Sequence, residues 1–324
     1  MQFRKHLSDL SRRLCLCAAA AFCLAANAQQ EVAEKHTHRS EGNPIFTHKF
    51  TADPAPLVVG DTLWLFTGVD GGPNLKRNMM REWAVFSTTD LKTWTEYPTP
   101  LRLTDFAWAK GGKAYAAQAV RRNGKYYWYV STDRCGIGVA VSDRPEGPYK
   151  DALGHPLLTN EDCYASDHTW ACIDPTVLID DDGQAWLFWG NGECYYAKLK
   201  GNMTEIDSPV KQVKFDGLVF EEAPWIHKHD GKYYLSYSEG FPEKTAYAMA
   251  DSIDGPYKYM GLLNELAGNC VTNHHGIAEF KGKWYFFYHN GALRGGGNDS
   301  RSVCVDRLYY NPDGSLRRVQ MTTE

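Results

Sequence analysis

The sequence predicts an all-β protein folded as a five-bladed β-propeller, and three observations lead to this prediction. From residue 43 onward the chain consists of short strand-like runs broken by Gly, Asp and Pro, with almost no helical periodicity. A turn glycine followed by an aromatic strand recurs five times, at Gly60, Gly124, Gly183, Gly231 and Gly282. The copies lie 64, 59, 48 and 51 residues apart, which is the size of a four-stranded propeller blade.

Each repeat has the same internal order. The glycine permits the positive φ of a hairpin turn, and the strand that follows is rich in β-prone residues. A third element comes next: residues 141–149 and 250–257 are near-duplicates of one another, and residues 83–94 hold the same place in the first copy. A sandwich would not explain the period, and parallel solenoids have shorter repeats. We therefore expect a single propeller domain over residues 43–324, with no second domain.

The N-terminal residues are predicted to be a targeting signal rather than part of the fold. Residues 1–28 carry four basic side chains, an apolar run from Leu14 to Ala26 and an Ala-Asn-Ala cleavage site. This run is too short for a permanent anchor, and no later apolar stretch reaches membrane length, so we expect no membrane span. Export to the periplasm or the extracellular space is expected. Residues 29–42 are polar and aperiodic, and we expect a flexible lead-in.

Charge and cysteine content narrow the function classes. The chain has a net charge of −4, and the mature part is close to −7 because residues 1–28 are net positive. Such a chain is a poor polyphosphate binder, so nucleic acid is not an expected partner. Six cysteines remain after the signal, without the C-x-x-C spacing of a zinc site. Disulfides and buried free thiols both remain open.

Ionisable residues recur at one place in the repeats. Asp53, Asp174, Glu222 and His274 each stand seven to nine residues before a turn glycine, whereas the second repeat has Tyr115 there. The first strand of each propeller blade lines the axis, so these side chains should converge at one mouth of the channel. An isolated Asp-Pro usually only caps a turn. Three carboxylates held close together repel and raise one another's pKa, a cost that is tolerated where the perturbed pKa is useful.

Converging carboxylates in an aromatic-lined pocket, without a metal motif or a nucleophile elbow, suit glycoside hydrolysis. The chain resembles glycoside hydrolase family 43, whose arabinose- and xylose-cleaving members are five-bladed propellers. The resemblance covers residues 43–323. Its motifs are Ala-Asp-Pro at 52–54, the run 173–183 with Trp189-Gly190, Glu-Ala-Pro-Trp at 222–225, Asn273-His274, and the tail 301–310.

The resemblance implies a role for each carboxylate. Asp53 would be the general base that activates water, Glu222 the general acid, and Asp174 the residue that tunes the pKa of the acid and orients it. Family members invert configuration, which requires a base-to-acid separation of roughly 6.5–9.5 Å. The residues themselves agree on the acid, since Trp225 and the blade core should desolvate Glu222. Adjacent strand residues face opposite ways, so only one of Glu221 and Glu222 can reach the axis.

Four further side chains are candidates for the substrate pocket. By the resemblance, Arg301 would contact the sugar, and Trp108 and Tyr115 would form walls, although many members carry Trp at the position of Tyr115. His274 corresponds to an axial histidine that in some members helps to hold a metal ion or water, so a Ca²⁺ ion near His274 is possible; the alternative is a hydrogen-bonded core histidine. No cofactor is expected to be required. The acidic run 180–183 is interpreted as a hairpin turn rather than a calcium loop.

The hypothesis is an exported, exo-acting, inverting glycosidase that releases xylose from xylan-type oligosaccharides or polysaccharides, a β-xylosidase. The alternative enzyme is an α-L-arabinofuranosidase, or an arabinan-degrading arabinosidase. Five-bladed fructosidases would show Asn-Asp-Pro-Asn and Arg-Asp-Pro motifs, which this chain lacks, and sialidases would need an arginine triad. A sugar-binding propeller without turnover is the alternative from another class, and the three carboxylates disfavour it.

Overall fold

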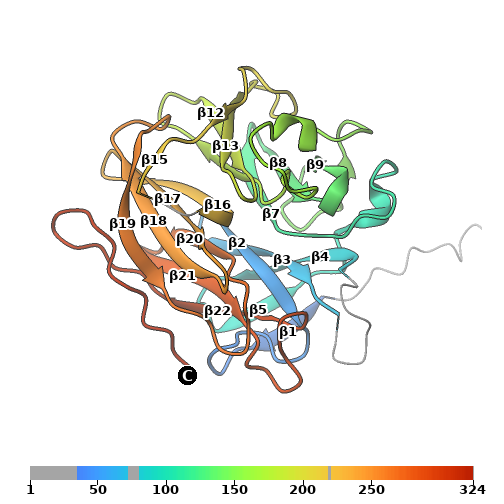
Figure 1. Cartoon of the computed structure of the whole chain (residues 1–324). Coiled ribbons are helices and arrows are strands. Elements are labelled where there is room, and N and C mark those ends of the chain that lie inside the picture. Colours follow the sequence, from blue (N-terminus) through green and yellow to red (C-terminus); the bar gives the residue numbers. More distant parts are fainter. Residues whose placement is uncertain (1–34, 72–79, 218–219, 324) are drawn as a thin grey trace, which may run out of the picture. The chain divides into compact units, whose positions relative to one another are not determined.

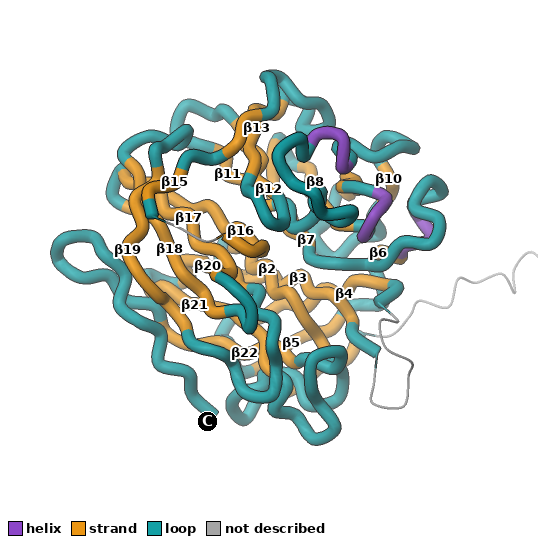
Figure 2. Tube along the Cα trace, viewed as in Figure 1, coloured by secondary structure: helices purple, strands orange, loops and turns teal. Residues whose placement is uncertain are grey.

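The computed structural model describes residues 35–71, 80–217 and 220–323; the predicted signal peptide, residues 1–28, lies outside them. Within this part, five sheets form the blades of a propeller, which confirms the predicted fold (Figure 1). Helix in the described residues is confined to three short 3-10 turns (Figure 2): η1 (Leu103–Asp105), η2 (Asp133–Cys135) and η3 (Asn160–Asp162). None of the described residues belongs to a helix long and apolar enough to cross a membrane.

Blades 1 and 2 come from the N-terminal half of the chain. Blade 1 contains β1 (His36–Arg39), β2 (Thr51–Val59), β3 (Thr62–Val69), β4 (Glu82–Thr88), β5 (Thr93–Glu96) and β6 (Leu101–Arg102). Blade 2 contains β7 (Ala117–Arg122), β8 (Lys125–Ser131), β9 (Ile137–Ser142) and β10 (Lys150–Asp151).

Blades 3 to 5 complete the ring. Blade 3 contains β11 (Thr176–Ile179), β12 (Ala185–Trp189), β13 (Tyr195–Leu199) and β14 (Lys211–Gln212). Blade 4 contains β15 (Phe215–Asp216), β16 (Phe220–His229), β17 (Lys232–Glu239), β18 (Lys244–Ala250) and β19 (Tyr257–Asn264). Blade 5 contains β20 (His275–Phe280), β21 (Lys283–Asn290) and β22 (Ser302–Arg307).

The innermost strands line the axis, as the repeat pattern predicts. Strand β2 contacts β7 and β20, β11 contacts β7 and β16, and β16 contacts β20, so the five strands form a closed ring. In Figure 1, β2, β16 and β20 lie near the middle of the picture, whereas β19 lies to the left of them, farther from the middle. The five turn glycines found in the sequence join each inner strand to the next strand outward, and all have φ between 59° and 81°. A side chain would be strained there, so glycine sets these turns.

Aromatic strands supply the packing between blades. Trp189 and Tyr195 of blade 3 pack with Tyr129 of blade 2, and all three are fully buried. Burying one such large side chain stabilises the fold by roughly 1.5–3 kcal/mol, so five blades packed face to face form an extensive core. All six cysteines of the described part are free, and five are buried, so the free-thiol alternative holds.

The described part of the predicted lead-in, from residue 35 onward, differs from the prediction, and residues 29–34 lie outside the described residues. Residues 36–39 were expected to be flexible, but they form β1 and pair with β5. The following segment closes the ring, because the amides of Ile45 and Thr51 donate to Val303 and Arg301 of blade 5. Asn43 does the same with its side chain, donating to the Val305 carbonyl at 3.0 Å. Polar composition hid this role, since edge-strand pairing uses backbone groups and requires no apolar pattern.

Candidate active site

A cavity of about 700 Å³ opens at one mouth of the axial channel. The inner strands and their preceding residues contribute its floor, and the connecting loops contribute its walls. Its lining residues include Asp53, Asp174 and Glu222 together with Asp70, Tyr115, Trp170, Thr272, His274 and Arg301. Glu221 does not line the cavity, and its backbone carbonyl instead accepts a hydrogen bond from Gly192 at 2.7 Å. The repeats therefore bring the three predicted carboxylates together, and Glu222 is the member of the acidic pair that faces inward.

An unusual backbone shape presents the carboxylates. Asp53, Asp174 and Ala223 each precede a proline and have φ of 52°, 58° and 55°. A left-handed conformation costs a non-glycine residue roughly 1–3 kcal/mol, so it persists only where the surroundings hold it in place. The β-bulges at Ala52/Ala55 in β2 and at Glu222/Trp225 in β16 mark the same bend.

This bend refines the predicted register. Counting back from the turn glycines put Glu222 at the repeat position of Asp53 and Asp174. In the structure, Ala223 has the backbone conformation of these two aspartates, and Glu222 lies one residue earlier. The amide of Ala223 donates to Asp174 Oδ2 at 3.0 Å, and the amide of Asp174 donates to Ser131 Oγ at 2.7 Å. Asp174 therefore holds the residue next to Glu222, in keeping with an orienting role.

Asp53 is held as a carboxylate. Arg301 Nη1 donates to its Oδ1 at 3.0 Å, and His289 Nδ1 lies 3.3 Å from the same oxygen. Burial alone would raise the pKa of Asp53, but the positive charge of Arg301 and the hydrogen bond to His289 outweigh burial and hold the pKa well below its usual range. Burial also opposes protonation of His289, yet its hydrogen bonds to Asp53 and Cys270 raise its pKa to about 9.

Asp70 anchors the arginine of this group. Arg301 Nε and Nη2 donate to the two carboxylate oxygens of Asp70 at 2.8 and 3.0 Å, a bidentate pair. The pair fixes the guanidinium plane, which leaves Nη1 directed at Asp53. Sequence reasoning missed both Asp70 and His289. Neither stands at the repeated position before a turn glycine, so no periodic signal could reveal them.

Glu222 is in the opposite electrostatic situation. The cavity walls enclose its carboxyl group, and this burial raises its pKa from 4.5 to about 7, with repulsion from Asp53 and Glu221 adding to the effect. Asn191 limits the rise because its Nδ2 donates to Glu222 Oε2 at 2.7 Å. At neutral pH a substantial fraction of Glu222 therefore carries a proton. Sequence reasoning did not single out Asn191, which follows the Trp189-Gly190 motif directly.

The pKa of Asp174 is raised well above its usual range, first by burial and then by the charges of Glu222 and Asp53. Of the three predicted carboxyl groups, Asp53 thus stays ionised, whereas Asp174 and Glu222 favour the protonated form. A base and an acid facing one cavity are the chemical requirement for cleaving an acetal bond by inversion.

Residues 42–316 match the model of a protein family described as glycosyl hydrolases family 43. The chain belongs to this family. It is 31% identical over 320 residues to the Aspergillus niger protein named beta-D-galactofuranosidase xynD, with 91% of this chain and 90% of that protein covered. It is also 31% identical over 333 residues to xylosidase/arabinosidase 43A of Humicola insolens, with 84% and 98% covered.

Solved structures agree with the family assignment. The chain is similar to CoXyl43, a family 43 β-xylosidase/α-arabinofuranosidase from a compost microbial metagenome, whose structure was solved with xylotriose in a calcium-free form. The TM-score is 0.76 and the sequence identity 30%, with 87% of this chain and 98% of that chain covered. This family 43 chain is accordingly a glycosidase.

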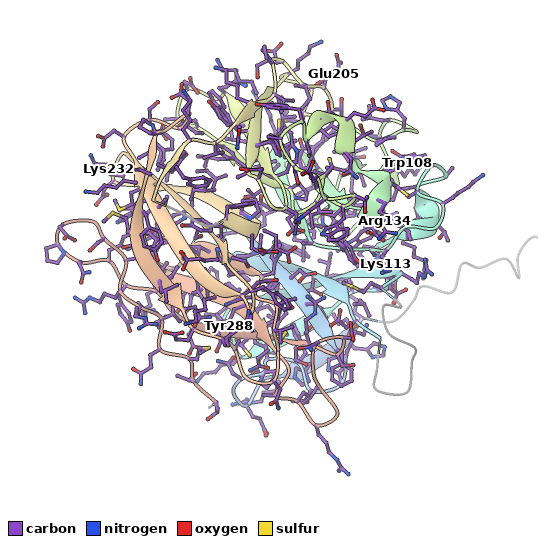
Figure 3. The ribbon with its side chains drawn as sticks, viewed as in Figure 1. Trp108, Lys113, Arg134, Glu205, Lys232 and Tyr288 are labelled. Atoms are coloured by element: carbon purple, nitrogen blue, oxygen red, sulfur yellow. The ribbon has the colours of Figure 1, made fainter. Side chains whose placement is uncertain are left out.

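Of the two aromatic residues predicted to form walls of this family 43 site, one lines the cavity and the other does not. Tyr115 is a lining residue. Trp108 packs away from the cavity against Phe106 and Gly138, and its Nε1 donates to Asp151 at 2.9 Å. Figure 3 labels Trp108 together with the lining residues Lys113 and Arg134.

Trp170, which sequence reasoning did not select, is the tryptophan that faces the cavity. It lines the wall and its side chain is 39% exposed. Periodicity could not find it, because it lies in the long loop between β10 and β11.

His274 lines the cavity, as predicted, and its Nδ1 lies 3.7 Å from Asp174 Oδ2. Burial lowers the pKa of His274 to about 4, so the imidazole is neutral. Among the residues that the structure describes, no three His, Cys, Asp or Glu side chains are grouped to hold a metal ion. Calcium takes six to eight oxygen ligands, and His274 offers one nitrogen, so the described side chains do not by themselves fit a calcium cage.

Proposed function

We propose that this family 43 enzyme is an exo-acting, inverting β-xylosidase that releases xylose from the non-reducing ends of xylan-type oligosaccharides. One observation carries the proposal: two carboxyl groups in the same cavity have pKa values displaced in opposite directions. The pKa of Asp53 lies below its usual range, whereas that of Glu222 is raised to about 7. A general base must be ionised and a general acid must be protonated before the same bond is cleaved.

The proposed reaction is a single displacement. Glu222 donates its proton to the glycosidic oxygen as the bond from that oxygen to the anomeric carbon breaks. Asp53 accepts a proton from a water molecule whose oxygen bonds to the opposite face of the anomeric carbon, so configuration inverts. Proton exchange with solvent then resets both groups. The scheme uses carboxyl groups only and needs no cofactor.

Asp174 acts on the acid in this scheme. Its hydrogen bond from the Ala223 amide supports a positioning role, because that bond holds the backbone beside Glu222. Burial raises its pKa and so favours the protonated form, which makes orientation its main contribution in this scheme. Arg301 supports Asp53 and, as a cavity residue, can also donate to a sugar hydroxyl.

The choice of xylose rests on the relatives. The Humicola protein is named as a xylosidase/arabinosidase and CoXyl43 was solved with xylotriose, so xylosides and arabinofuranosides are the leading substrates. Hydrolysis of 4-nitrophenyl β-D-xyloside should be measured beside 4-nitrophenyl α-L-arabinofuranoside and the β-D-galactofuranoside. A higher kcat/KM on the xyloside is expected. A preference for the arabinofuranoside would favour the second candidate, an α-L-arabinofuranosidase.

Mechanism and turnover have their own tests. Proton NMR during hydrolysis of a xyloside should show the α-anomer of xylose first, and a β-anomer formed first would contradict the inverting scheme. Binding of xylo-oligosaccharides without any hydrolysis would instead indicate a sugar-binding propeller.

Two further features are proposals about the mature enzyme. We propose that residues 1–28 direct export, which N-terminal sequencing of the secreted or periplasmic protein would test by finding Gln29 at the start. An axial calcium ion, if bound, would be held near His274 through water. Dialysis against a chelator, with metal content and activity measured before and after, would test this.

A further inference from the structure

The loop between β10 and β11 carries two aromatic side chains that stack on one another. Trp170 forms part of the cavity wall, and the ring of His168 stacks beneath it with centroids 5.2 Å apart and planes inclined by 27°. His168 is partly buried and does not line the cavity. It therefore lies in the layer of side chains immediately behind the wall.

Asn191 connects this layer to Glu222. Its Nδ2 donates to Glu222 Oε2 at 2.7 Å, which leaves its Oδ1 as an acceptor, and Oδ1 makes a short hydrogen bond with His168 Nδ1. An amide has one donor end and one acceptor end, so His168 must carry a proton on Nδ1 to complete the chain. These two hydrogen bonds link His168 to Asn191 and Asn191 to Glu222.

Neighbouring bonds hold Asn191 in place. Asn191 is only 2% exposed. Its backbone N–H donates to the Ala171 carbonyl at 3.1 Å, and its backbone carbonyl accepts from Ser166 Oγ at 3.0 Å. The next residue, Gly192, donates to the Glu221 carbonyl at 2.7 Å. The loop that carries His168 is thus tied to the strand that carries the acid through both side-chain and backbone bonds.

The acid and the base are supported from different parts of the ring. Arg301 and His289 of blade 5 hold Asp53, whereas Asn191 of blade 3 holds Glu222. In an inverting reaction the acid faces the leaving group and the base faces the water. The side of the cavity near His168 is therefore the leaving-group side. The residues that hold the Glu222 carboxyl group in position determine how well it protonates the leaving oxygen.

We propose that His168 is a positioning residue of this enzyme, which orients the general acid through Asn191 and does not touch the substrate. The inference rests on the proposed function, because it assumes that Glu222 is the acid. It predicts a selective defect. Substrates with poor leaving groups need a well-placed proton donor, whereas activated substrates such as dinitrophenyl glycosides need little proton assistance.

The test compares His168→Ala and His168→Gln with wild type on xylobiose and on 2,4-dinitrophenyl β-D-xyloside. For His168→Ala, kcat/KM on xylobiose should fall about tenfold to a hundredfold, within the range of general acid catalysis, with a change of less than about twofold on the dinitrophenyl substrate. His168→Gln should recover part of the loss, because its side-chain amide can donate to Asn191. Thr169→Ala is the matched control, since Thr169 is exposed and lies between His168 and Trp170; it should match wild type on both substrates.

The pH profile gives an independent readout. The Asn191 hydrogen bond lowers the pKa of Glu222, so loosening it should raise that pKa and move the basic limb of kcat/KM to higher pH in His168→Ala. Equal losses on both substrates with an unmoved limb would overturn the inference, and so would unchanged kinetics on xylobiose. If the alanine variant does not fold, the glutamine variant is judged by the same two criteria. Failure of the wild type to hydrolyse either substrate would refute the proposed function instead.

Discussion

Replacing Glu222 with glutamine should abolish most activity while stabilising the protein at alkaline pH. Glutamine has nearly the same shape, and its side-chain oxygen can still accept the hydrogen bond from Asn191. It cannot donate an acidic proton, so kcat/KM on xylobiose should fall by about 10²–10⁴. It also carries no charge, so it avoids the cost of ionising a carboxyl group inside the cavity.

The structure sets the size and the sign of the stability effect. The pKa of Glu222 is raised from 4.5 to about 7, and at about 1.4 kcal/mol per pH unit this corresponds to about 3 kcal/mol as an upper value. The native state binds the proton more tightly than the unfolded chain, so wild-type stability declines as pH rises from 4.5 through 7. The cavity is open to water, and we expect about 1–3 kcal/mol to be realised.

Urea denaturation of wild type and Glu222→Gln at pH 4.5 and pH 8 measures this effect. The variant should match wild type at pH 4.5 and exceed it in free energy of unfolding at pH 8. Glu221→Gln, one residue away and outside the cavity, is the control and should show no gain of that size. A wild type–variant difference that is the same at both pH values would refute the assignment of the raised pKa to Glu222.

Three other outcomes follow from the site. Asp53→Asn should lower kcat by orders of magnitude with folding intact, and near-normal turnover in a folded variant would contradict its role as base; circular dichroism and steady-state kinetics decide this. Asp70→Asn breaks the bidentate pair that orients Arg301 toward Asp53. The pKa of Asp53 should therefore rise, and the acidic limb of the kcat/KM pH profile should move to higher pH. An unmoved acidic limb would contradict this role of Asp70. For wild type, the basic limb of kcat/KM should fall near pH 7, where Glu222 loses its proton; a rate that stays constant up to pH 9 would show that Glu222 is not the acid.

Some of the site could be predicted because it repeats. Each of the residues Asp53, Asp174, Glu222 and His274 stands seven to nine residues before a turn glycine, and the fold brings these positions to one mouth of the channel. The choice of Glu222 over Glu221 rested on its place before Ala-Pro, and strand alternation required only that one of the two reach the axis.

Other parts could not be predicted, because they depend on loops and on contacts between blades. Trp108 and Trp170 are both loop tryptophans, and nothing in their neighbouring residues indicates that Trp170 lines the cavity while Trp108 packs beside Phe106. Polar composition led residues 36–39 to be expected flexible, although backbone hydrogen bonds hold them in β1.

The amino-acid sequence by itself determined the number of blades, their turns and the carboxylates at the axis, because each depends on short-range rules: positive φ at glycine, alternation in strands and a fixed repeat length. Only the tertiary structure decided what surrounds each carboxylate. Asp53 faces the guanidinium of Arg301, which is 248 residues away in the chain, whereas Glu222 faces the neutral amide of Asn191. A pKa depends on burial and on charges within a few ångströms, so two similar side chains at similar places in the repeat acquire opposite chemistry.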